Sequence, residues 1–407
     1  MLIYAPDKLQ ASITLPASKS ISNRALVIRA LSGSRLPIDN ISPCDDSTVV
    51  VDALRDMPHV IDIKAAGTAM RFLTSLLATV PGEHIITGTE RMRNRPISIL
   101  VDALRSLGGD IEYLEAEGYP PLKISGKQLS GGSMALPGNV SSQYISSLLM
   151  IAPTLQHGLT LELTGEVISK PYIDMTMAIM KQFGAVACWT SENEICVKAV
   201  PYSPIPYYIE GDWSAASYWY EIMALTNDRN AEVVLPGLFR NSLQGDAQVT
   251  DIFELLGIGT HYGDHYVSLH KTGHVTNKLD LDMRNQPDLA QTVVVTCCML
   301  GIPFRISGLQ TLRIKETDRI TALQRELGKL GFSLGVEGDD AVHWNGRISD
   351  IPEENVGIDT YDDHRMAMAF APVALKRGHI VINNPEVVSK SYPAYWDDLG
   401  QAGFSLQ

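Results

Sequence analysis

The chain has 407 residues, of which 45% are hydrophobic and 19% charged, and its formal net charge is −13. This length exceeds the size over which one hydrophobic core keeps growing, so two domains are expected, and the composition excludes a disordered or fibrous protein. The negative charge disfavours nonspecific attraction to nucleic acid or to an anionic membrane surface.

The chain opens with a strand pattern from Leu2 to Leu15, and six copies of one longer pattern follow it. In each copy a polar or basic turn precedes an apolar-periodic helix and a strand, and Gly or Asn ends the copy 20 to 23 residues after its start. The copies start at Lys19, Gly67, Ser142, Ser214, Asp288 and His364, and they end at Asn40, Gly88, Gly165, Gly237, Gly308 and Asn384. Since such a repeat indicates one supersecondary unit copied around a shared core, turns of different copies can be brought to one place.

The second copy shows the complete unit. Apolar spacing predicts a helix over residues 67–80, which Pro81-Gly82 ends, and then a strand over residues 84–87. A second helix and two short strands follow, over residues 97–107, 111–114 and 122–125. Comparable second helices are expected over residues 173–183, 249–256, 320–330 and 394–399. The unit is therefore strand, helix, strand, helix, strand, strand, and the predicted fold class is α/β.

The first copy is shorter than the others. Only one short strand fits between Pro58 and Ala65, so we expect this copy to lack its hairpin. Residues 201–206 are rich in proline, and Glu210-Gly211-Asp212 follow them at the midpoint of the six copies. The second half is therefore expected to begin near residue 211, whereas the opening strand could belong to either half.

Basic residues gather at the starts of the predicted helices. Helix amino termini already offer unpaired N–H groups and a partial positive charge, so added guanidinium and ammonium groups create sites for anions. A single charge of this kind is more simply explained as a solvated surface group, but the set runs against the usual preference for Asp and Glu at helix starts. The set of basic residues therefore indicates a small ligand with several negative groups. Its members are Lys19, Arg24, Arg71, Arg91, Arg93, Arg95, Lys170, Lys315, Arg319, Arg365 and Lys390.

Two acids, Asp288 and Glu316, stand among these bases next to predicted helix starts. Carboxylates beside cations stay ionised at neutral pH and can accept a proton, as a general base must. The alternatives are an N-cap for Asp288 and a capping or paired role for Glu316. Serines in the turns 139–144 and 169–172 could bind a hydroxylated ring and its phosphate, although Ser141 could equally cap a helix.

Metal and redox chemistry are not expected. The five cysteines include no Cys-x-x-Cys pair, their number is odd, and no histidine stands at zinc-site spacing. No apolar run approaches the roughly 18 residues that cross a bilayer, and no basic segment followed by a hydrophobic one begins the chain. We therefore expect a cytoplasmic protein.

Seven motifs carry a resemblance to a known family. They are Pro16-Ala17-Ser18-Lys19-Ser20 with Arg24, Ala66-Gly67-Thr68-Ala69-Met70-Arg71, Arg95-Pro96, Val140-Ser141-Ser142-Gln143, Ser169-Lys170-Pro171-Tyr172, Lys315-Glu316-Thr317-Asp318-Arg319 and Asp363-His364-Arg365-Met366-Ala367. In this order and combination, from about residue 6 to the end, they resemble the 5-enolpyruvylshikimate-3-phosphate synthase family of the shikimate pathway.

The resemblance implies a fold and a reaction. The fold would be an inside-out α/β barrel of two domains, residues 17–210 and residues 1–16 plus 211–407, each with three βαβαββ repeats and joined by two crossings that close over the substrates. The enzyme would transfer the enolpyruvyl group of phosphoenolpyruvate to the 5-hydroxyl of shikimate 3-phosphate through a tetrahedral intermediate, releasing phosphate. It would need neither metal nor cofactor, act as a monomer and be inhibited by glyphosate.

The resemblance also implies roles for individual residues. Asp288 would take the proton of the 5-hydroxyl, and Glu316 with Lys19 would protonate and later deprotonate the methylene carbon. Shikimate 3-phosphate would be held by Lys19, Ser20, Arg24, Ser141, Ser142, Gln143, Ser169, Tyr172, Asp288 and Lys315. Phosphoenolpyruvate would be held by Lys19, Gly67, Thr68, Arg95, Gln143, Arg319, Arg365 and Lys390.

Some positions depart from the family pattern. Ala65 and Thr311 stand where Asn is common, and Phe72 stands where Pro is common, so the resemblance implies no substrate contact at the first two. The nearest rival is the related transferase that uses UDP-N-acetylglucosamine, which has Lys-Asn near its start and a loop cysteine; here Ser20 follows Lys19, and no cysteine lies between Cys44 and Cys188. A repeat scaffold that binds RNA is a second rival, which the acidity of the chain disfavours.

Overall fold

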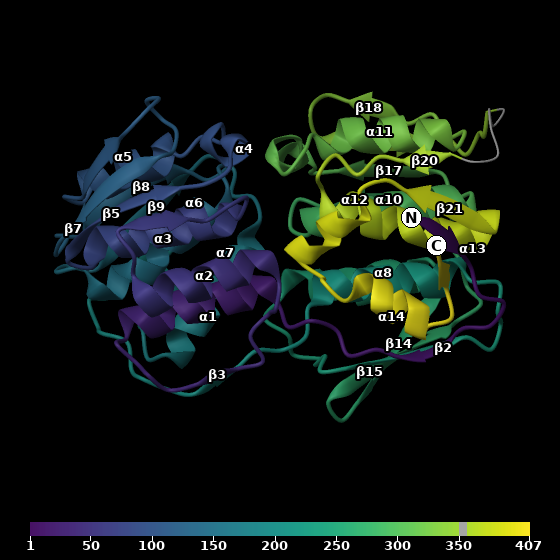
Figure 1. Cartoon of the computed structure of the whole chain (residues 1–407), viewed down its shortest axis with the longest axis horizontal. Helices are drawn as coiled ribbons and strands as arrows, with labels where there is room; N and C mark the ends of the chain where they lie inside the picture. The colour runs from purple at the N-terminus through teal and green to yellow at the C-terminus, as the bar shows by residue number, and fades with distance from the viewer. Residues whose placement is uncertain (350–355) are drawn as a thin grey trace. The chain divides into compact units, whose positions relative to one another are not determined.

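The computed structural model describes residues 1–349 and 356–407, and the chain divides into two compact units. Unit 1 comprises Met1–Pro16 and Glu210–Gln407, and unit 2 comprises Ala17–Ile209. Both contain helices and strands in alternation, which confirms the predicted α/β class (Figure 1).

Unit 2 is built from two four-stranded sheets and a two-stranded one. The sheet orders are β4-β5-β7-β6, β10-β11-β9-β8 and β12-β3. Its strands are β3 (Ile38–Asp39), β4 (Val60–Asp62), β5 (Gly82–Thr87), β6 (Asp110–Tyr113), β7 (Leu122–Gly126), β8 (Gly132–Pro137), β9 (Leu159–Thr164), β10 (Ala187–Trp189), β11 (Glu194–Val197) and β12 (Tyr207–Tyr208). Its helices are α1 (Lys19–Leu31), α2 (Asp45–Asp56), α3 (Gly67–Thr79), α4 (Glu90–Arg93), α5 (Ser98–Ser106), α6 (Ser142–Ile151) and α7 (Lys170–Gln182).

Unit 1 contains three four-stranded sheets, ordered β14-β15-β13-β2, β16-β17-β19-β18 and β20-β21-β1-β22. Its strands are β1 (Leu2–Tyr4), β2 (Gln10–Ser12), β13 (Glu232–Pro236), β14 (Ile258–Gly263), β15 (Tyr266–Lys271), β16 (Leu279–Asp282), β17 (Phe304–Ser307), β18 (Gly335–Glu337), β19 (Ala341–Trp344), β20 (Gly357–Ile358), β21 (His379–Ile382) and β22 (Ser405–Leu406). Its α-helices are α8 (Trp213–Leu225), α9 (Val249–Leu255), α10 (Ala290–Leu300), α11 (Arg319–Lys329), α12 (His364–Phe370), α13 (Ala374–Arg377) and α14 (Tyr395–Gln401). Short 3-10 turns, among them η3 (Pro287–Leu289) and η4 (Gln310–Ile314), precede several of the helices.

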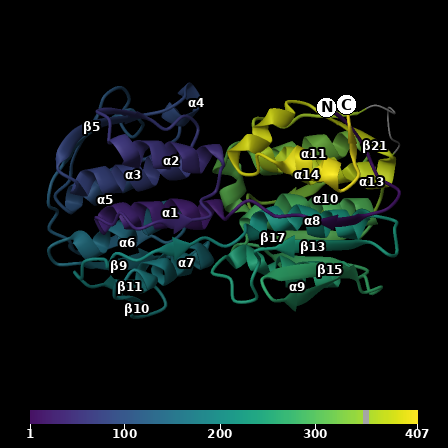
Figure 2. The same cartoon turned by 60° about the horizontal axis from the view of Figure 1, so that its bottom comes forward.

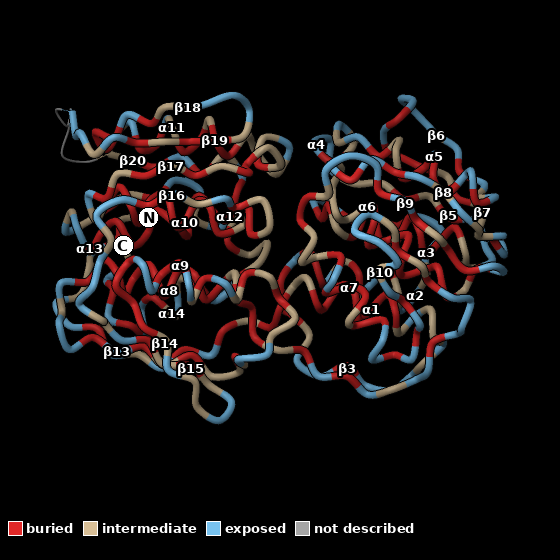
Figure 3. Tube along the Cα trace, turned by 180° about the vertical axis from the view of Figure 1, so that it is seen from behind, coloured by how far each residue is buried: buried red, intermediate tan, exposed pale blue. Residues whose placement is uncertain are grey.

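The first helix of each copy lies at the centre of its unit. In unit 1, α8, α10 and α12 contact one another, and each also packs against its own sheet, through β13 and β15, β17, and β21 respectively. In unit 2, α1, α3 and α6 contact one another in the same way (Figure 2). Most residues of these helices are buried, as expected for helices that neighbours cover on several sides, although α1 also buries the polar side chains of Ser22, Asn23 and Arg24 (Figure 3).

The helix starts and the ends of the copies agree with the repeat found in the sequence. The predicted starts are the first residues of α1, α3, α6 and α12, the second residue of α8, and a residue of η3 just before α10. Five of the six ends have positive φ, namely Asn40, Gly165, Gly237, Gly308 and Asn384. At the sixth, Gly88, a Cβ would lie 2.5 Å from the carbonyl oxygen of Lys64. Gly and Asn therefore recur because five ends need the left-handed conformation and one has no room for a side chain.

The chain start was predicted wrongly as one strand. Residues 2–15 form two strands, because Pro6 interrupts the pattern and β1 and β2 join different sheets of unit 1. β2 pairs in parallel with β13, and β12 pairs in parallel with β3. Each crossing of the chain between the units is thus preceded by a strand that stays in the unit being left. As predicted, one short strand, β4, lies between Pro58 and Ala65.

Candidate functional site

Arg319, the first residue of α11, is the centre of a charged cluster in unit 1. Its guanidinium is 2% exposed and contacts three carboxylates. Nε donates to Asp363 Oδ2 at 2.7 Å, Nη1 to Asp288 Oδ1 at 3.1 Å, and Nη2 to Glu316 Oε2 at 2.9 Å. Burial alone would lower the pKa of Arg319, but attraction by Asp363, Glu316 and Asp288 raises it above its ordinary value. The cluster therefore keeps a charged guanidinium in the interior.

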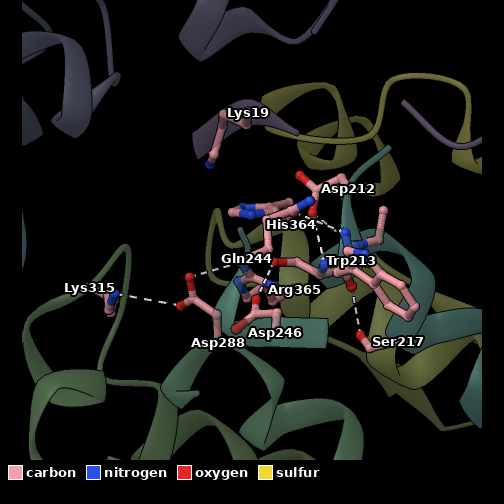
Figure 4. A network of polar contacts seen from close by, with 12 residues as sticks. Lys19, Asp212, Trp213, Ser217, Gln244, Asp246, Asp288, Lys315, His364 and Arg365 are labelled. Carbon is pink, nitrogen blue, oxygen red and sulfur yellow. Dashed lines mark hydrogen bonds and ion pairs between the residues drawn. The ribbon is translucent and has the colours of Figure 1, made fainter. Parts of the chain in front are cut away.

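Asp288 is the carboxylate on which most of these cations converge. Lys315 Nζ lies 3.5 Å from Oδ1, and Arg365 Nη2 lies 3.0 Å from Oδ2 (Figure 4). Arg319 Nη1 also contacts Oδ1. Burial tends to raise the pKa of Asp288, but the charges of Arg365, Lys315 and Arg319 outweigh it and hold the pKa well below its usual range. Asp288 is consequently ionised at neutral pH.

Neither of the two acids caps a helix. The N-cap of η3 is Gln286 and that of α10 is Leu289, so Asp288 caps neither. Glu316 precedes α11, whose N-cap is Asp318. Glu316 Oε1 lies 3.0 Å from Lys390 Nζ, so this carboxylate bridges Lys390 and Arg319. The sequence prediction of a paired Glu316 is therefore correct, but with cations from two distant segments.

Three groups of this cluster were not predicted as site residues. Asp363 is fully buried, caps α12 by accepting from the backbone N–H of Arg365 at 2.9 Å, and also binds Arg319. The Tyr218 hydroxyl accepts from Arg365 Nη1 at 3.4 Å, and burial raises the pKa of Tyr218 to about 12. Asp246 is 4% exposed and accepts from the Ser214 hydroxyl. Burial, and then the charge of Asp288, raise the pKa of Asp246 to about 7.

Unit 2 contains a second basic cluster, whose partners are mostly uncharged. Lys19, the first residue of α1, lies 3.5 Å from the buried Asp46. Arg24, one turn later, is 2% exposed. It donates to the hydroxyls of Thr176 and Ser146 and to the carbonyls of Ser20 and Tyr172, at 2.7 to 3.4 Å. Because the guanidinium is buried with neutral partners, its pKa is lowered to about 10.

The turn at Gly67 brings several predicted residues together. An added Cβ at Gly67 would lie 2.5 Å from Arg95 Nη1 and 3.2 Å from Arg71 Nη1, so both guanidinium groups lie against this backbone. Arg71 donates to the Gly67 carbonyl at 3.0 Å. Beside them, Gln143 Nε2 donates to the Thr68 hydroxyl at 3.0 Å. Arg95, Gly67, Thr68 and Gln143 thus form one polar surface at the starts of α3 and α6.

The predicted serines have different local roles. Ser141 is the N-cap of α6 and accepts from the Gln143 backbone N–H at 3.4 Å, so the capping alternative is observed. Ser142 opens that helix. Ser169 precedes α7 in the left-handed conformation, φ 55°, and its side chain makes no capping bond. Tyr172 lies in the first turn of α7, and its carbonyl binds Arg24.

Two of the predicted basic residues contact other parts of the surface. Arg93 pairs with the exposed Glu115 at 3.1 Å, and Lys170 Nζ lies 4.5 Å from the centre of the Trp189 ring. Along residues 1–349 and 356–407, no three His, Cys, Asp or Glu side chains are grouped so as to hold a metal ion. None of the described helices is both long and apolar enough to span a bilayer.

Comparison with known proteins gives consistent results. A family model described as EPSP synthase (3-phosphoshikimate 1-carboxyvinyltransferase) matches residues 3–59 and 56–399. The 3-phosphoshikimate 1-carboxyvinyltransferase of Bacteroides fragilis (strain ATCC 25285) is 55% identical, over 100% of this chain and 98% of that protein. The enzyme of that name from Vibrio cholerae (strain M66-2) is 37% identical over 97% of each. The solved EPSP synthase of Acinetobacter baumannii has the same fold, with a TM-score of 0.77 at 21% identity over 100% of this chain and 99% of that one.

Proposed function

Because the chain belongs to the EPSP synthase family, it transfers the enolpyruvyl group of phosphoenolpyruvate to shikimate 3-phosphate in aromatic amino-acid biosynthesis, and we propose how its two units divide this work. Unit 2 mainly binds shikimate 3-phosphate. Unit 1 supplies the acid–base groups and much of the phosphoenolpyruvate site. The proposal rests on one observation above all, the position of Asp288 among three cations.

We propose that the fold is the inside-out α/β barrel of that family, with six βαβαββ units, three in each half and the first one truncated. The recurrence of four-stranded sheets with one antiparallel hairpin supports this assignment. The domains would be residues 17–210 and residues 1–16 plus 211–407, close to the division into units 1 and 2. We further propose that the enzyme acts in the cytoplasm and that it is a monomer. Light scattering on the purified protein would test the monomeric state.

Shikimate 3-phosphate carries a phosphate, a carboxylate and hydroxyls, and unit 2 offers groups suited to each. The buried charge of Arg24 has only neutral partners, so a nearby anion would stabilise it. Ser169 is held in a left-handed conformation with its hydroxyl unused for capping, as suits a residue kept for a ligand. The full proposed set is Lys19, Ser20, Arg24, Ser141, Ser142, Gln143, Ser169 and Tyr172, with Asp288 and Lys315 from unit 1.

Phosphoenolpyruvate carries a carboxylate and a phosphate, for which guanidinium groups are well suited because they donate two parallel hydrogen bonds. We assign these anions to Arg319, Arg365 and Lys390 of unit 1, and to Lys19, Gly67, Thr68, Arg95 and Gln143 of unit 2. Arg95 lies against Gly67, where the absence of a side chain leaves backbone groups within reach of a ligand.

The proposed chemistry begins at Asp288. Its carboxylate takes the proton of the 5-hydroxyl while that oxygen bonds to C2 of phosphoenolpyruvate, and C3 receives a proton from Glu316 or Lys19. In the second step the bond from C2 to the phosphate oxygen breaks, C3 loses a proton to the same groups, and phosphate leaves. The cations around both anions stabilise the charge that develops in the tetrahedral intermediate.

The cations also explain how Asp288 can act as a base. In the structure they hold its pKa well below the usual range, which makes it a weak base. When anionic substrates bind Arg319, Arg365 and Lys315, part of the positive charge is neutralised, and the pKa of Asp288 rises toward the range useful for proton transfer. Substrate binding would thus activate the base.

The decisive experiment measures inorganic phosphate released from phosphoenolpyruvate by the purified enzyme. We expect release only when shikimate 3-phosphate is added. Release with UDP-N-acetylglucosamine instead would favour the related transferase, and retention of RNA on a filter without phosphate release would favour a binding scaffold.

Glyphosate, a mimic of phosphoenolpyruvate, should inhibit the reaction, and unchanged activity at millimolar concentrations of glyphosate would contradict the proposed phosphoenolpyruvate site.

A further inference from the structure

Two cysteines outside the proposed site face each other on neighbouring strands. β10 and β11 are antiparallel, with Cys188 directly opposite Cys196. Two hydrogen bonds fix the alternation along this ladder: Thr190 N–H donates to the Glu194 carbonyl at 2.8 Å, and Lys198 N–H donates to the Val186 carbonyl at 2.9 Å. Since hydrogen-bonded pairs recur at every second position, Cys188 and Cys196 also form such a pair.

Both thiols lie on the outer face of the sheet. The alternate residues Ala187, Ile195 and Val197 are buried, whereas Cys188 is exposed and Cys196 is partly exposed. β10 is moreover the edge strand of its sheet (Figure 2). The remaining cysteines, Cys44, Cys297 and Cys298, are buried and out of reach of reagents in solution. Reactivity of the native protein toward thiol reagents is therefore concentrated in one hairpin.

We propose that Cys188 and Cys196 are a thiol–disulfide exchange site, which a low-molecular-weight disulfide such as oxidised glutathione converts to a cross-strand disulfide. Directly opposed residues in a hydrogen-bonded pair have Cα atoms about 5.5 Å apart, within the range that disulfides span. Their Cβ atoms, about 5 Å apart, must approach to about 4 Å. The bond thus forms without rearrangement of the fold but under some strain, so thiols should reduce it readily.

The proposed reaction has two exchange steps. The thiolate of Cys188, the more exposed residue, attacks one sulfur of the small disulfide, and the first small thiolate leaves. The thiolate of Cys196 then attacks the sulfur of Cys188 in the mixed disulfide, and the second small thiolate leaves. The two protein thiols are oxidised, the small disulfide is reduced to two thiols, and the two protons released by the protein end on these products.

The thiol pair is separate from the proposed substrate residues. Trp189 follows Cys188 in β10, so its side chain lies on the opposite face of the sheet. Its ring lies 4.5 Å from Lys170 Nζ, and its Nε1 donates to Asp174 Oδ1 at 2.8 Å; both partners belong to α7. The cysteines therefore lie on the sheet face opposite α7. Replacing either by serine should leave the activity of the reduced enzyme unchanged.

The test treats the full reduced chain with oxidised glutathione, quenches with acid, alkylates free thiols and maps them by mass spectrometry. We expect a mass loss of two hydrogen atoms, protection of Cys188 and Cys196 together, and complete reversal by dithiothreitol. Cys188→Ser and Cys196→Ser should each give one glutathione adduct on the remaining thiol and no internal disulfide.

A register control uses Cys188→Ser combined with Thr190→Cys. This variant keeps two thiols on the same face of the sheet, because Thr190 is exposed and lies two residues after Cys188, directly after β10. Position 190 is diagonal to Cys196, however, and diagonal neighbours are about 7–8 Å apart. This variant should stop at adducts. The proposal is overturned if the unaltered chain also yields only adducts or disulfide-linked dimers, or if the diagonal pair closes as readily.

Discussion

In unit 1 the buried guanidinium of Arg319 contacts three carboxylates, whereas in unit 2 the buried guanidinium of Arg24 contacts hydroxyl and carbonyl oxygens and the ring of Phe72, all of them uncharged. The consequence appears in their titration. The pKa of Arg319 is raised by its acidic neighbours against the effect of burial, and that of Arg24 is lowered by burial to about 10. Burying a charge is costly unless an opposite charge accompanies it.

The difference teaches what each cluster is prepared to do. In unit 1 the charges already balance one another, so Asp288 stays ionised and any incoming anion must compete with Asp288 and Glu316 for the cations. In unit 2 the hydrogen-bond partners of Arg24 are neutral, so a bound anion would not compete with a carboxylate for this guanidinium. Unit 1 is thus arranged for proton transfer, and unit 2 for binding. Changes that alter this balance should separate turnover from affinity.

The largest effect is expected from Asp288→Asn. The amide keeps the shape of the side chain but cannot accept the hydroxyl proton, so kcat should fall by about 1000-fold or more, within the range of general acid–base catalysis. The affinity for shikimate 3-phosphate, measured by calorimetry, should change little. Asp339→Asn is the matched control, because Asp339 is 95% exposed and touches the site nowhere. Normal turnover of the Asp288 variant would show that this carboxylate is not the base.

The second effect is expected from Arg24→Met, which removes the uncompensated charge but fills most of the space. Affinity for shikimate 3-phosphate should fall by about 100-fold, or ~2.7 kcal/mol, near the upper end for hydrogen bonds to charged groups. The kcat at saturation should fall much less. Arg29→Met, on the same helix α1, controls for loss of a positive charge. A lowered melting temperature with unchanged affinity would make Arg24 a structural residue only.

Much of this framework could be predicted from the sequence because it repeats. The helix starts, the strand ends at Gly or Asn and the basic turns follow from local rules that six copies reinforce. The opening segment has no copy to compare with, and there the two strands separated by Pro6 were read as one. The alternation of apolar residues does not show that two consecutive strands, here β1 and β2, pair in different sheets.

The charge balance of unit 1 could not be predicted in the same way. Asp288, Glu316 and their cations stand out as a set, but their pairing depends on segments far apart in the chain, such as Lys390 with Glu316. Asp363 looks like an ordinary helix cap, and only the fold places it against Arg319. Asp246 has no motif at all, and its environment becomes visible only when its burial is known.

The third effect concerns Asp246, the acid that unit 1 keeps partly neutral. Its pKa is about 7 in the folded protein, above the ordinary value of 3.8, so the folded state holds a proton that the unfolded state has lost between these pH values. The stabilisation is present at low pH and disappears as the pH rises through 7. Between pH 5 and 8 the free energy of unfolding should therefore lose on the order of 2 kcal/mol from this group.

Asp246→Asn should abolish that loss. The amide can still accept from the Ser214 hydroxyl, so the variant should match the unaltered protein below pH 3.8, the ordinary pKa of Asp, and become the more stable of the two as the pH rises toward 8. Urea unfolding at several pH values measures the difference, and Asp251→Asn, an exposed acid nearby, should leave the pH dependence intact. Parallel curves for the Asp246 variant and the unaltered protein would show that this carboxyl is ionised throughout.

The smallest effect is expected in unit 2, from Gly67→Ala. The new methyl group would lie 2.5 Å from Arg95 Nη1, closer than atoms in proteins approach, but the end of a flexible arginine can move aside. Stability should therefore stay nearly constant, while the displaced guanidinium loses one of its contacts with phosphoenolpyruvate and the KM for this substrate rises about tenfold, ~1.4 kcal/mol. The KM for shikimate 3-phosphate should not change, because Arg24 is untouched.

The control for this prediction is Gly328→Ala in unit 1, because Gly328 has an ordinary helical backbone and open space around it. Gly33→Ala is unsuitable as a control, since Gly33 has positive φ. If the alanine at position 67 raised the KM of both substrates equally, the turn would be distorted as a whole, and Arg95 could not be assigned to one anion.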